Sequence, residues 1–257
     1  MYENVDPQNC NPPGTFLTKL PHPANSNRSV EKAVIMEHRF AFFFWMKWRN
    51  QLQDIQSDQQ APTLVTIDWH RDFAPPTDKQ KKSLLQLDQS NLSDVSNYVW
   101  ARFAQTNDAH IRCATWLNLV GDVILLKNTA EEMHQTIMDH EGREHTFYEF
   151  GDFERFQNFI LDREDQHIFF DIDLDYFIHG KGKRHYSEDF SRYTDEEIKT
   201  VIDPQQPVFQ HILPKCEGIT LAQEPGYCGG MLNSAHIMTV IYEQLFAANG
   251  DWPQLQN

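Results

Sequence analysis

Two short polar motifs contain the residues most able to do chemistry in this chain. The first reads Asp-Trp-His-Arg-Asp and places Asp68, His70 and Asp72 at alternate positions. The second reads Asp-Ile-Asp and places Asp171 and Asp173 in the same way. Alternate residues of an extended segment point to the same side, so the polar side chains of each motif converge. Because four carboxylates brought together repel one another unless cations neutralise them, the two motifs predict a metal centre.

The donor types restrict which metal such a centre would hold. Either motif alone would also suit loop caps and surface salt bridges, whereas the two together favour metal. The donors are mostly carboxylate oxygens with imidazole and no thiolate, which favours manganese and leaves zinc or iron open. Two cations bridged by Asp68 and Asp171 would lower the pKa of a shared water and supply hydroxide at neutral pH. Cysteines at positions 10, 113, 216 and 228 have no zinc-finger spacing.

Each motif ends a segment that predicts a buried strand. Residues 63–68 (TLVTID) and 167–173 (HIFFDID) are rich in apolar residues and finish in carboxylates. Apolar patterns and a capping box at Thr194 predict further strands and helices. These strands cover residues 33–36, 123–126 and 219–222, and these helices cover residues 39–48, 93–103, 152–161, 194–202 and 232–246. The alternation predicts an α/β fold, a three-layer sandwich in which helices flank a mostly parallel sheet, with ligands beyond the carboxyl ends of its strands.

Composition limits the class of protein. The chain has 257 residues, 40% of them hydrophobic, which predicts one sizeable domain. Five prolines before Arg28 predict an irregular lead-in over residues 1–28, followed by a single catalytic domain over residues 29–257. The longest apolar run, residues 40–46, is too short to span a membrane, and no secretory signal is evident, so we expect a cytoplasmic protein. A net charge of −15 argues against nucleic acid and suits either a cationic substrate or solubility.

The motifs resemble those of a known family. Residues 66–72 (TIDWHRD) and 169–173 (FFDID) are similar to the two signature motifs of the ureohydrolase branch of the arginase/deacetylase fold. The continuation over residues 174–177 (LDYF) and the segment over residues 222–230 (AQEPGYCGG) look more like a divergent branch that includes peptide arginases. Those enzymes convert arginine residues of ribosomally made precursor peptides into ornithine. The resemblance implies two Mn²⁺ ions in an arginase-like domain.

The resemblance also implies roles for further residues. His38 would complete the first metal site, although a buried or capping histidine is the alternative reading. Glu224 would hold the guanidinium of the substrate, because a carboxylate matches that planar fork; an ordinary turn glutamate is the alternative. His110 would give a proton to the departing amine. Asp175 would support a ligand or bind substrate, whereas Arg71 should point away from the metals by strand alternation.

The implied reaction is hydrolysis of the arginine guanidinium to ornithine and urea, with a precursor peptide as the substrate and partner. A basic patch at Lys181, Lys183, Arg184 and His185 would contact an acidic leader of that peptide or would be solvated surface. Two alternatives stay open. One is a small-molecule ureohydrolase or a deacetylase-like amide hydrolase of the same fold, and the other is a noncatalytic metal-binding protein.

Overall fold

One mixed sheet organises the computed structural model, which describes residues 10–55, 60–103, 107–128, 132–179 and 191–246. Within these residues the sheet has eight strands, in the order β1 (Phe16–His22), β2 (Asn25–Ile35), β10 (Cys216–Ala222), β7 (Ile168–Asp173), β3 (Thr63–Ile67), β4 (Val123–Leu126), β6 (Glu144–Phe150) and β5 (Met133–Met138). The six inner strands pair in parallel, and β1 and β5 are antiparallel at the two edges. The mostly parallel sheet that we expected is therefore confirmed.

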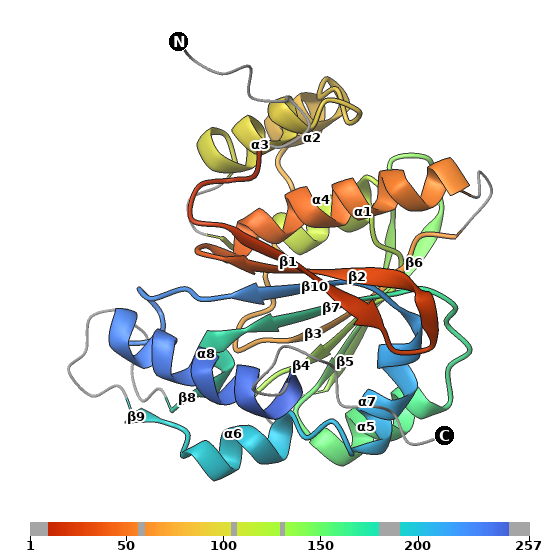
Figure 1. Ribbon diagram of the computed structural model, residues 1–257. Coiled ribbons are helices and arrows are strands. Elements are labelled where there is room, and N and C mark those ends of the chain that lie inside the picture. The colour runs from red at the N-terminus through yellow and green to blue at the C-terminus, as the bar shows by residue number, and fades with distance from the viewer. Residues whose placement is uncertain (1–9, 56–59, 104–106, 129–131, 180–190, 247–257) are drawn as a thin grey trace.

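Helices cover both faces of this sheet (Figure 1). The face drawn uppermost carries α1 (Ala41–Ile55), α2 (Asp78–Leu85), α3 (Leu92–Ala101) and α4 (His110–Trp116). The opposite face carries α5 (Phe153–Leu161), α6 (Asp195–Val201), α7 (Pro207–Ile212) and α8 (Met231–Leu245). Each face has its own apolar cluster, so the layers pack as a helix–sheet–helix arrangement.

The strands at the centre of the sheet are buried on both sides. Every residue of β3 and β7 is buried, which explains why their sequences are nearly continuous apolar runs. Phe170 belongs to the apolar cluster on the α5 side, and Phe169 belongs to the cluster on the α1 side. Since side chains alternate along a strand, Asp171 and Asp173 face the α1 side together with Phe169.

The start of the chain differs from our expectation. Residues 16–28 belong to a hairpin of β1 and β2 and are not an irregular lead-in. Pro21 pairs with Ser29 in β1, which is the edge strand, and edge strands tolerate a residue that lacks an N–H donor. The proline content of this segment therefore indicated an edge strand and a turn instead of loss of regular structure.

A close approach between α1 and β10 helps to fix the helix that follows His38. A Cβ atom built on Gly218 would overlap the Trp48 ring, so glycine is required at this point of β10. Trp48 Nε1 also donates to Glu31 Oε2 at 2.9 Å, and Lys47 pairs with the same carboxylate at 2.7 Å. These contacts tie α1 to β2 and β10.

The remaining elements are short. They are the 3-10 helices η2 (His38–Phe40), η3 (Leu174–Phe177) and η4 (Leu213–Lys215), and a two-stranded ribbon of β8 (Ile178–His179) and β9 (Ser191–Arg192). Within the described residues, no helix is both long and apolar enough to cross a membrane. The basic patch from Lys181 to His185 lies outside the described residues.

Candidate metal centre

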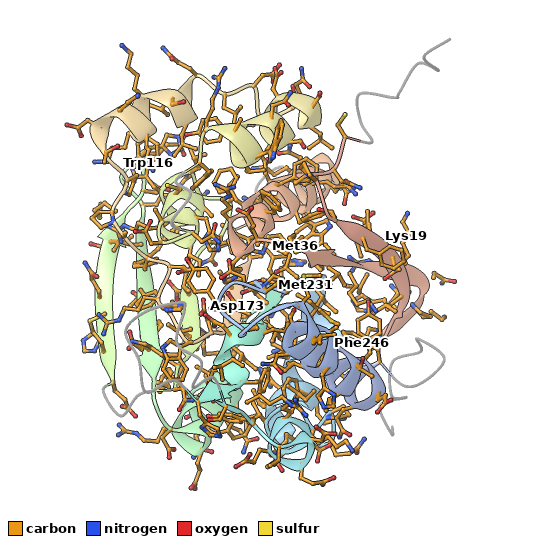
Figure 2. The ribbon with its side chains drawn as sticks, turned by 90° about the vertical axis from the view of Figure 1, so that its left-hand side faces the viewer. Lys19, Met36, Trp116, Asp173, Met231 and Phe246 are labelled. Carbon is orange, nitrogen blue, oxygen red and sulfur yellow. The ribbon has the colours of Figure 1, made fainter. Side chains whose placement is uncertain are left out.

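The carboxyl edge of the sheet collects polar residues from four adjacent strands. His38 begins η2 just beyond β2, and Asp68 follows β3 directly. Asp173 is the last residue of β7, and Glu224 comes two residues after β10. Because these four strands are parallel neighbours, their carboxyl ends meet at one edge, where Figure 2 labels Asp173.

A first group of possible metal ligands surrounds the imidazole of His38. Its Nδ1 lies 3.0 Å from Asp72 Oδ2 and 3.1 Å from Asp173 Oδ2. Asp68 Oδ2 is 3.4 Å from the same nitrogen. One ligand atom from each of these four residues lies within 4.8 Å of the others, a separation that one cation can span. Three of the four residues are almost fully buried, and Asp72 is 9% exposed, so a cation there would be shielded from bulk water.

A second group lies beside the first and consists of Asp68, His70 and Asp175. His70 Nδ1 is 2.8 Å from Asp175 Oδ2. The backbone N–H of His70 donates to Asp68 Oδ1 at 2.6 Å, and that of Trp69 donates to Asp175 Oδ1 at 3.3 Å. These backbone donors orient the two carboxylates. Asp68 belongs to both groups, so the two groups of possible ligands adjoin each other.

One buried oxygen at this junction is suited to binding a cation. Asp68 Oδ2 is buried and makes no hydrogen bond with the described residues. A buried carboxylate oxygen without a partner is costly, and a bound cation removes that cost. The buried His and Asp groups can therefore hold a metal ion.

Asp171 has a different place from the one we expected. In β7 it pairs with Thr66 of β3 and Thr220 of β10, and both hydroxyls donate to its carboxylate, that of Thr66 at 2.7 Å. His38 Nε2 lies 2.8 Å from the same carboxylate. Asp171 belongs to none of the groups of possible ligands among the described residues, whereas Asp175 belongs to two of them. The geometry thus favours Asp173 and Asp175 as the ligand pair, two residues later than the sequence suggested.

The concentrated negative charge perturbs the titration of the site. Burial raises the pKa of Asp68 well above its usual value, and the carboxylate of Asp72 raises it further. Burial and the charge of Asp175 raise the pKa of Asp173 to about 7. Burial alone would lower the pKa of His70, but its hydrogen bond to Asp175 and the charge of that carboxylate raise it to about 9. Protons therefore occupy the site when no cation neutralises it.

His110 lies behind His38 and is fully buried. Its ring centroid is 4.3 Å from that of His38, and Trp45 stacks on it with centroids 5.6 Å apart. Burial lowers the pKa of His110 well below its usual value, and the nearby His38 lowers it further. Its Nδ1 is 3.6 Å from Asp72 Oδ2, and the three residues His38, Asp72 and His110 form a further possible ligand group. This placement favours support of the metal centre over proton transfer to a substrate.

Glu224 is held at the site by its own strained backbone and by two donors. Its φ of 37° lies in the left-handed region, which a residue with a side chain rarely adopts. The backbone N–H of His38 donates to Glu224 Oε1 at 2.8 Å, and the Asn107 side-chain amide donates to the same oxygen. Burial and the charge of Asp173 raise the pKa of Glu224 well above its usual value. A cation beside Glu224 would restore its ionised form.

A groove of about 470 Å³ opens from the centre. Its wall includes the site residues His70, Asp72 and Glu224. The other wall residues are Arg71, Phe73, Ala74, Asn107, Asp108, Met133, Gln135 and Tyr227. His110 is not among them, although we expected it to meet the substrate.

Two residues of this groove contact predicted site residues but were not expected from the sequence. Asn107 supports Glu224, and its φ of 54° is left-handed. The Tyr227 ring packs edge-on against His70 with centroids 5.7 Å apart. Only their positions in the sequence could have indicated them. Asn107 lies three residues before His110, and Tyr227 lies three residues after Glu224.

A scan against protein-family models and a search of curated proteins found no match for this chain.

Proposed function

We propose that this chain is a hydrolase that holds two divalent cations and cleaves the guanidinium group of arginine. The observation that carries the proposal is the sharing of Asp68 between two adjacent ligand groups, beside the buried carboxylate of Glu224. Paired cations suit hydrolysis, and a carboxylate next to them suits a guanidinium.

The ligands divide between the two cation positions. His38, Asp72 and Asp173 would hold the first cation, and His70 and Asp175 the second, with Asp68 shared by both groups. A donor set of carboxylate oxygens with two imidazoles supports manganese. Once bound, such a pair lowers the pKa of water and supplies a nucleophile at neutral pH.

Residues around the cations bind and orient the substrate. The Glu224 carboxylate would pair with the planar guanidinium, while His38 N–H and the Asn107 amide keep that carboxylate in place. Asp171 accepts from His38 Nε2 and so directs His38 Nδ1 toward the first cation. The expectation that His110 gives a proton to the departing amine has no support from its buried position.

The extent of the groove supports a peptide as the substrate. Glu224 follows β10 and Gln135 lies on β5, and five inter-strand intervals separate these strands. At roughly 4.8 Å per interval this corresponds to about 24 Å between the strands. One arginine would fill only part of that length. We therefore propose an arginine-containing peptide as the substrate, with the modified peptide, now containing ornithine, and urea as products. The resemblance to peptide arginases implies that this peptide is made ribosomally.

Mass spectrometry tests this function directly. Full-length protein loaded with Mn²⁺ is incubated with an arginine-containing peptide and, separately, with free arginine. Conversion of arginine to ornithine by metal-assisted hydrolysis lowers the mass by about 42 Da. Glu224→Gln should bind two Mn²⁺ ions without producing this loss. Glu196→Gln, which alters an exposed side chain on α6, is the matched control and should behave as the parent protein does.

A second candidate function follows from a specific contact group. Asp173, Asp175 and Glu224 also lie close enough together to hold a cation. If Glu224 is a metal ligand, Asp108 is the one carboxylate of the described groove wall outside the ligand groups. An amide hydrolase or a noncatalytic metal-binding protein then becomes the better assignment. Loss of one Mn²⁺ ion from Glu224→Gln would favour this second candidate. So would a parent protein that binds two ions but lowers the mass of neither substrate.

A further inference from the structure

Arg71, which strand alternation predicted to point away from the metals, is part of the wall of the groove. Its backbone lies between the possible ligands His70 and Asp72. Its Nε and Nη2 both donate to the carboxylate of Glu149 on β6, the Nη2 bond being 3.2 Å long. The side chain of Glu149 is fully buried, whereas that of Arg71 is 41% exposed. The guanidinium is thus fixed on one edge and accessible on another.

The charges around Glu149 do not balance. Lys127 Nζ lies 3.5 Å from Glu149 Oε1, so two cations face one carboxylate. Among the described residues, Arg71 Nη1 makes no hydrogen bond. An arginine that is already oriented and has a free donor edge loses little conformational entropy when it binds an anion.

Arg71 also differs from the rest of the groove. The other charged wall residues, apart from the titratable His70, are the acids Asp72, Asp108 and Glu224, and Arg71 is the one lysine or arginine in the described wall. If the cationic group of a ligand meets Glu224, an anionic group of the same ligand would be favourable at Arg71. The groove has opposite charges in two places, which suits a substrate with opposite charges in two places.

We propose that Arg71 binds a carboxylate of the substrate, at a point remote from the guanidinium that reacts. This inference rests on the proposed function and narrows its substrate class to guanidino compounds that carry a carboxylate. Glu149 lies on β6, two inter-strand intervals from β3, whose end carries Asp68. That is about 10 Å between strands. Either the α-carboxylate of arginine itself or an acidic side chain near arginine in a peptide can supply the anion at this range.

The test compares substrates that differ only in the carboxylate. One arm uses arginine and agmatine, which lacks the α-carboxylate. The other arm uses two amidated peptides that carry aspartate or asparagine beside the arginine. Each pair is measured with the Mn²⁺-loaded parent protein, with Arg71→Gln, and with Arg71→Lys, which keeps the charge but loses the fork. Arg155→Gln, on the exposed face of α5, is the matched control.

In at least one arm, we expect the ratio of kcat/KM for the carboxylate-bearing over the carboxylate-lacking substrate to fall about 10- to 100-fold in Arg71→Gln, through KM. Arg71→Lys should recover part of the ratio, and Arg155→Gln should keep it. A change in the first arm alone identifies the α-carboxylate, and one in the second alone identifies a peptide side chain. An unchanged ratio in both arms, with Mn²⁺ content intact, overturns the inference.

A binding measurement separates this inference from the proposed function. If the parent protein hydrolyses no guanidino compound, the proposed function fails, and calorimetry with ornithine and putrescine still tests Arg71, because these amines differ only in the carboxylate. Tighter binding of ornithine that disappears in Arg71→Gln supports the inference. Equal binding of the two amines by the parent protein, together with equal binding of the aspartate and asparagine peptides, overturns it.

Discussion

Replacing Asp171 or Asp175 with asparagine should have different effects on the number of bound metal ions. Asp171 accepts from two threonine hydroxyls and from His38 Nε2 at 2.8 Å, and it lies in no ligand group within the described chain. The Asp171→Asn variant would keep an acceptor for His38 but lose the negative charge. A hydrogen bond to a charged group contributes about 1–1.5 kcal/mol more than a neutral one, so affinity for the first Mn²⁺ should fall about tenfold. Two ions should still bind at saturation.

Asp175→Asn would remove a proposed metal ligand, whereas Asp171→Asn changes a residue that orients the ligand His38. The Asp175 carboxylate lies 2.8 Å from His70 Nδ1 and belongs to the second ligand group. Without its charge, the second position keeps His70 as its only unshared donor, and we expect the bound Mn²⁺ to fall from two ions to one per chain.

Calorimetric titration and metal analysis after desalting measure both quantities. Electron paramagnetic resonance should also show loss of the spin coupling between paired Mn²⁺ ions in Asp175→Asn only. Asp78→Asn, at a fully exposed position of α2, is the control. If Asp171→Asn binds one ion while Asp175→Asn binds two, our assignment of Asp173 and Asp175 as the ligand pair is refuted. The pair predicted from the sequence, Asp171 and Asp173, is then the better assignment.

Three further predictions concern pH, metal removal and packing. The pKa of Asp173, raised by burial and Asp175 to about 7 from 3.8, means that the metal-free fold keeps a proton that the unfolded chain loses near pH 4. The bound proton therefore stabilises the metal-free fold at low pH, and this stabilisation is lost as pH rises through 7. At pH 6 Mn²⁺ must displace the proton from Asp173, whereas at pH 8 the carboxylate is already ionised. The apparent affinity for Mn²⁺, measured by calorimetry, should therefore rise about tenfold between pH 6 and pH 8 from this group alone. An affinity that is the same at both pH values would contradict a protonated site. Chelation should lower the free energy of unfolding by about 2.7 kcal/mol relative to protein at a Mn²⁺ concentration 100 times Kd, measured by urea titration; equal stability with and without chelator would argue against a folded-state metal site. Gly218→Ala places a Cβ against Trp48 and should cost about 1–3 kcal/mol in the same titration, so a change within about 0.5 kcal/mol would show that α1 can shift.

Local sequence patterns were sufficient for the central elements. The strand that we expected over residues 123–126 is β4 with the same bounds, and the capping box at Thr194 and Glu197 opens α6 as expected. These signals depend only on neighbouring residues. The edge strand β1 was missed because Pro21 suits an edge as well as a loop, and only the pairing partner distinguishes the two. The outer strands β5 and β6 and the helices α2, α4 and α7 were also absent from the sequence prediction.

The chemistry of the site follows the same division. Sequence alone indicated that aspartates and histidines at alternate positions would gather where buried strands end, because the two-residue repeat of a strand is a local property. It could not decide between Asp171 and Asp175, since residues 171 and 173 share a strand face with the same spacing as residues 173 and 175. Their surroundings differ in the tertiary structure, because only Asp171 has a threonine opposite it on each neighbouring strand.

The surroundings of the site were likewise decided by tertiary structure. Three contacts depend on residues that are distant in the sequence. His110 packs against His38, Asn107 donates to Glu224, and Arg71 pairs with Glu149. Sequence therefore determined which atoms could bind a cation and roughly where. Only the packing of parallel strands and the loops beyond them decided which of those atoms face one another, because side-chain direction after a strand depends on contacts with other segments and not on the local repeat.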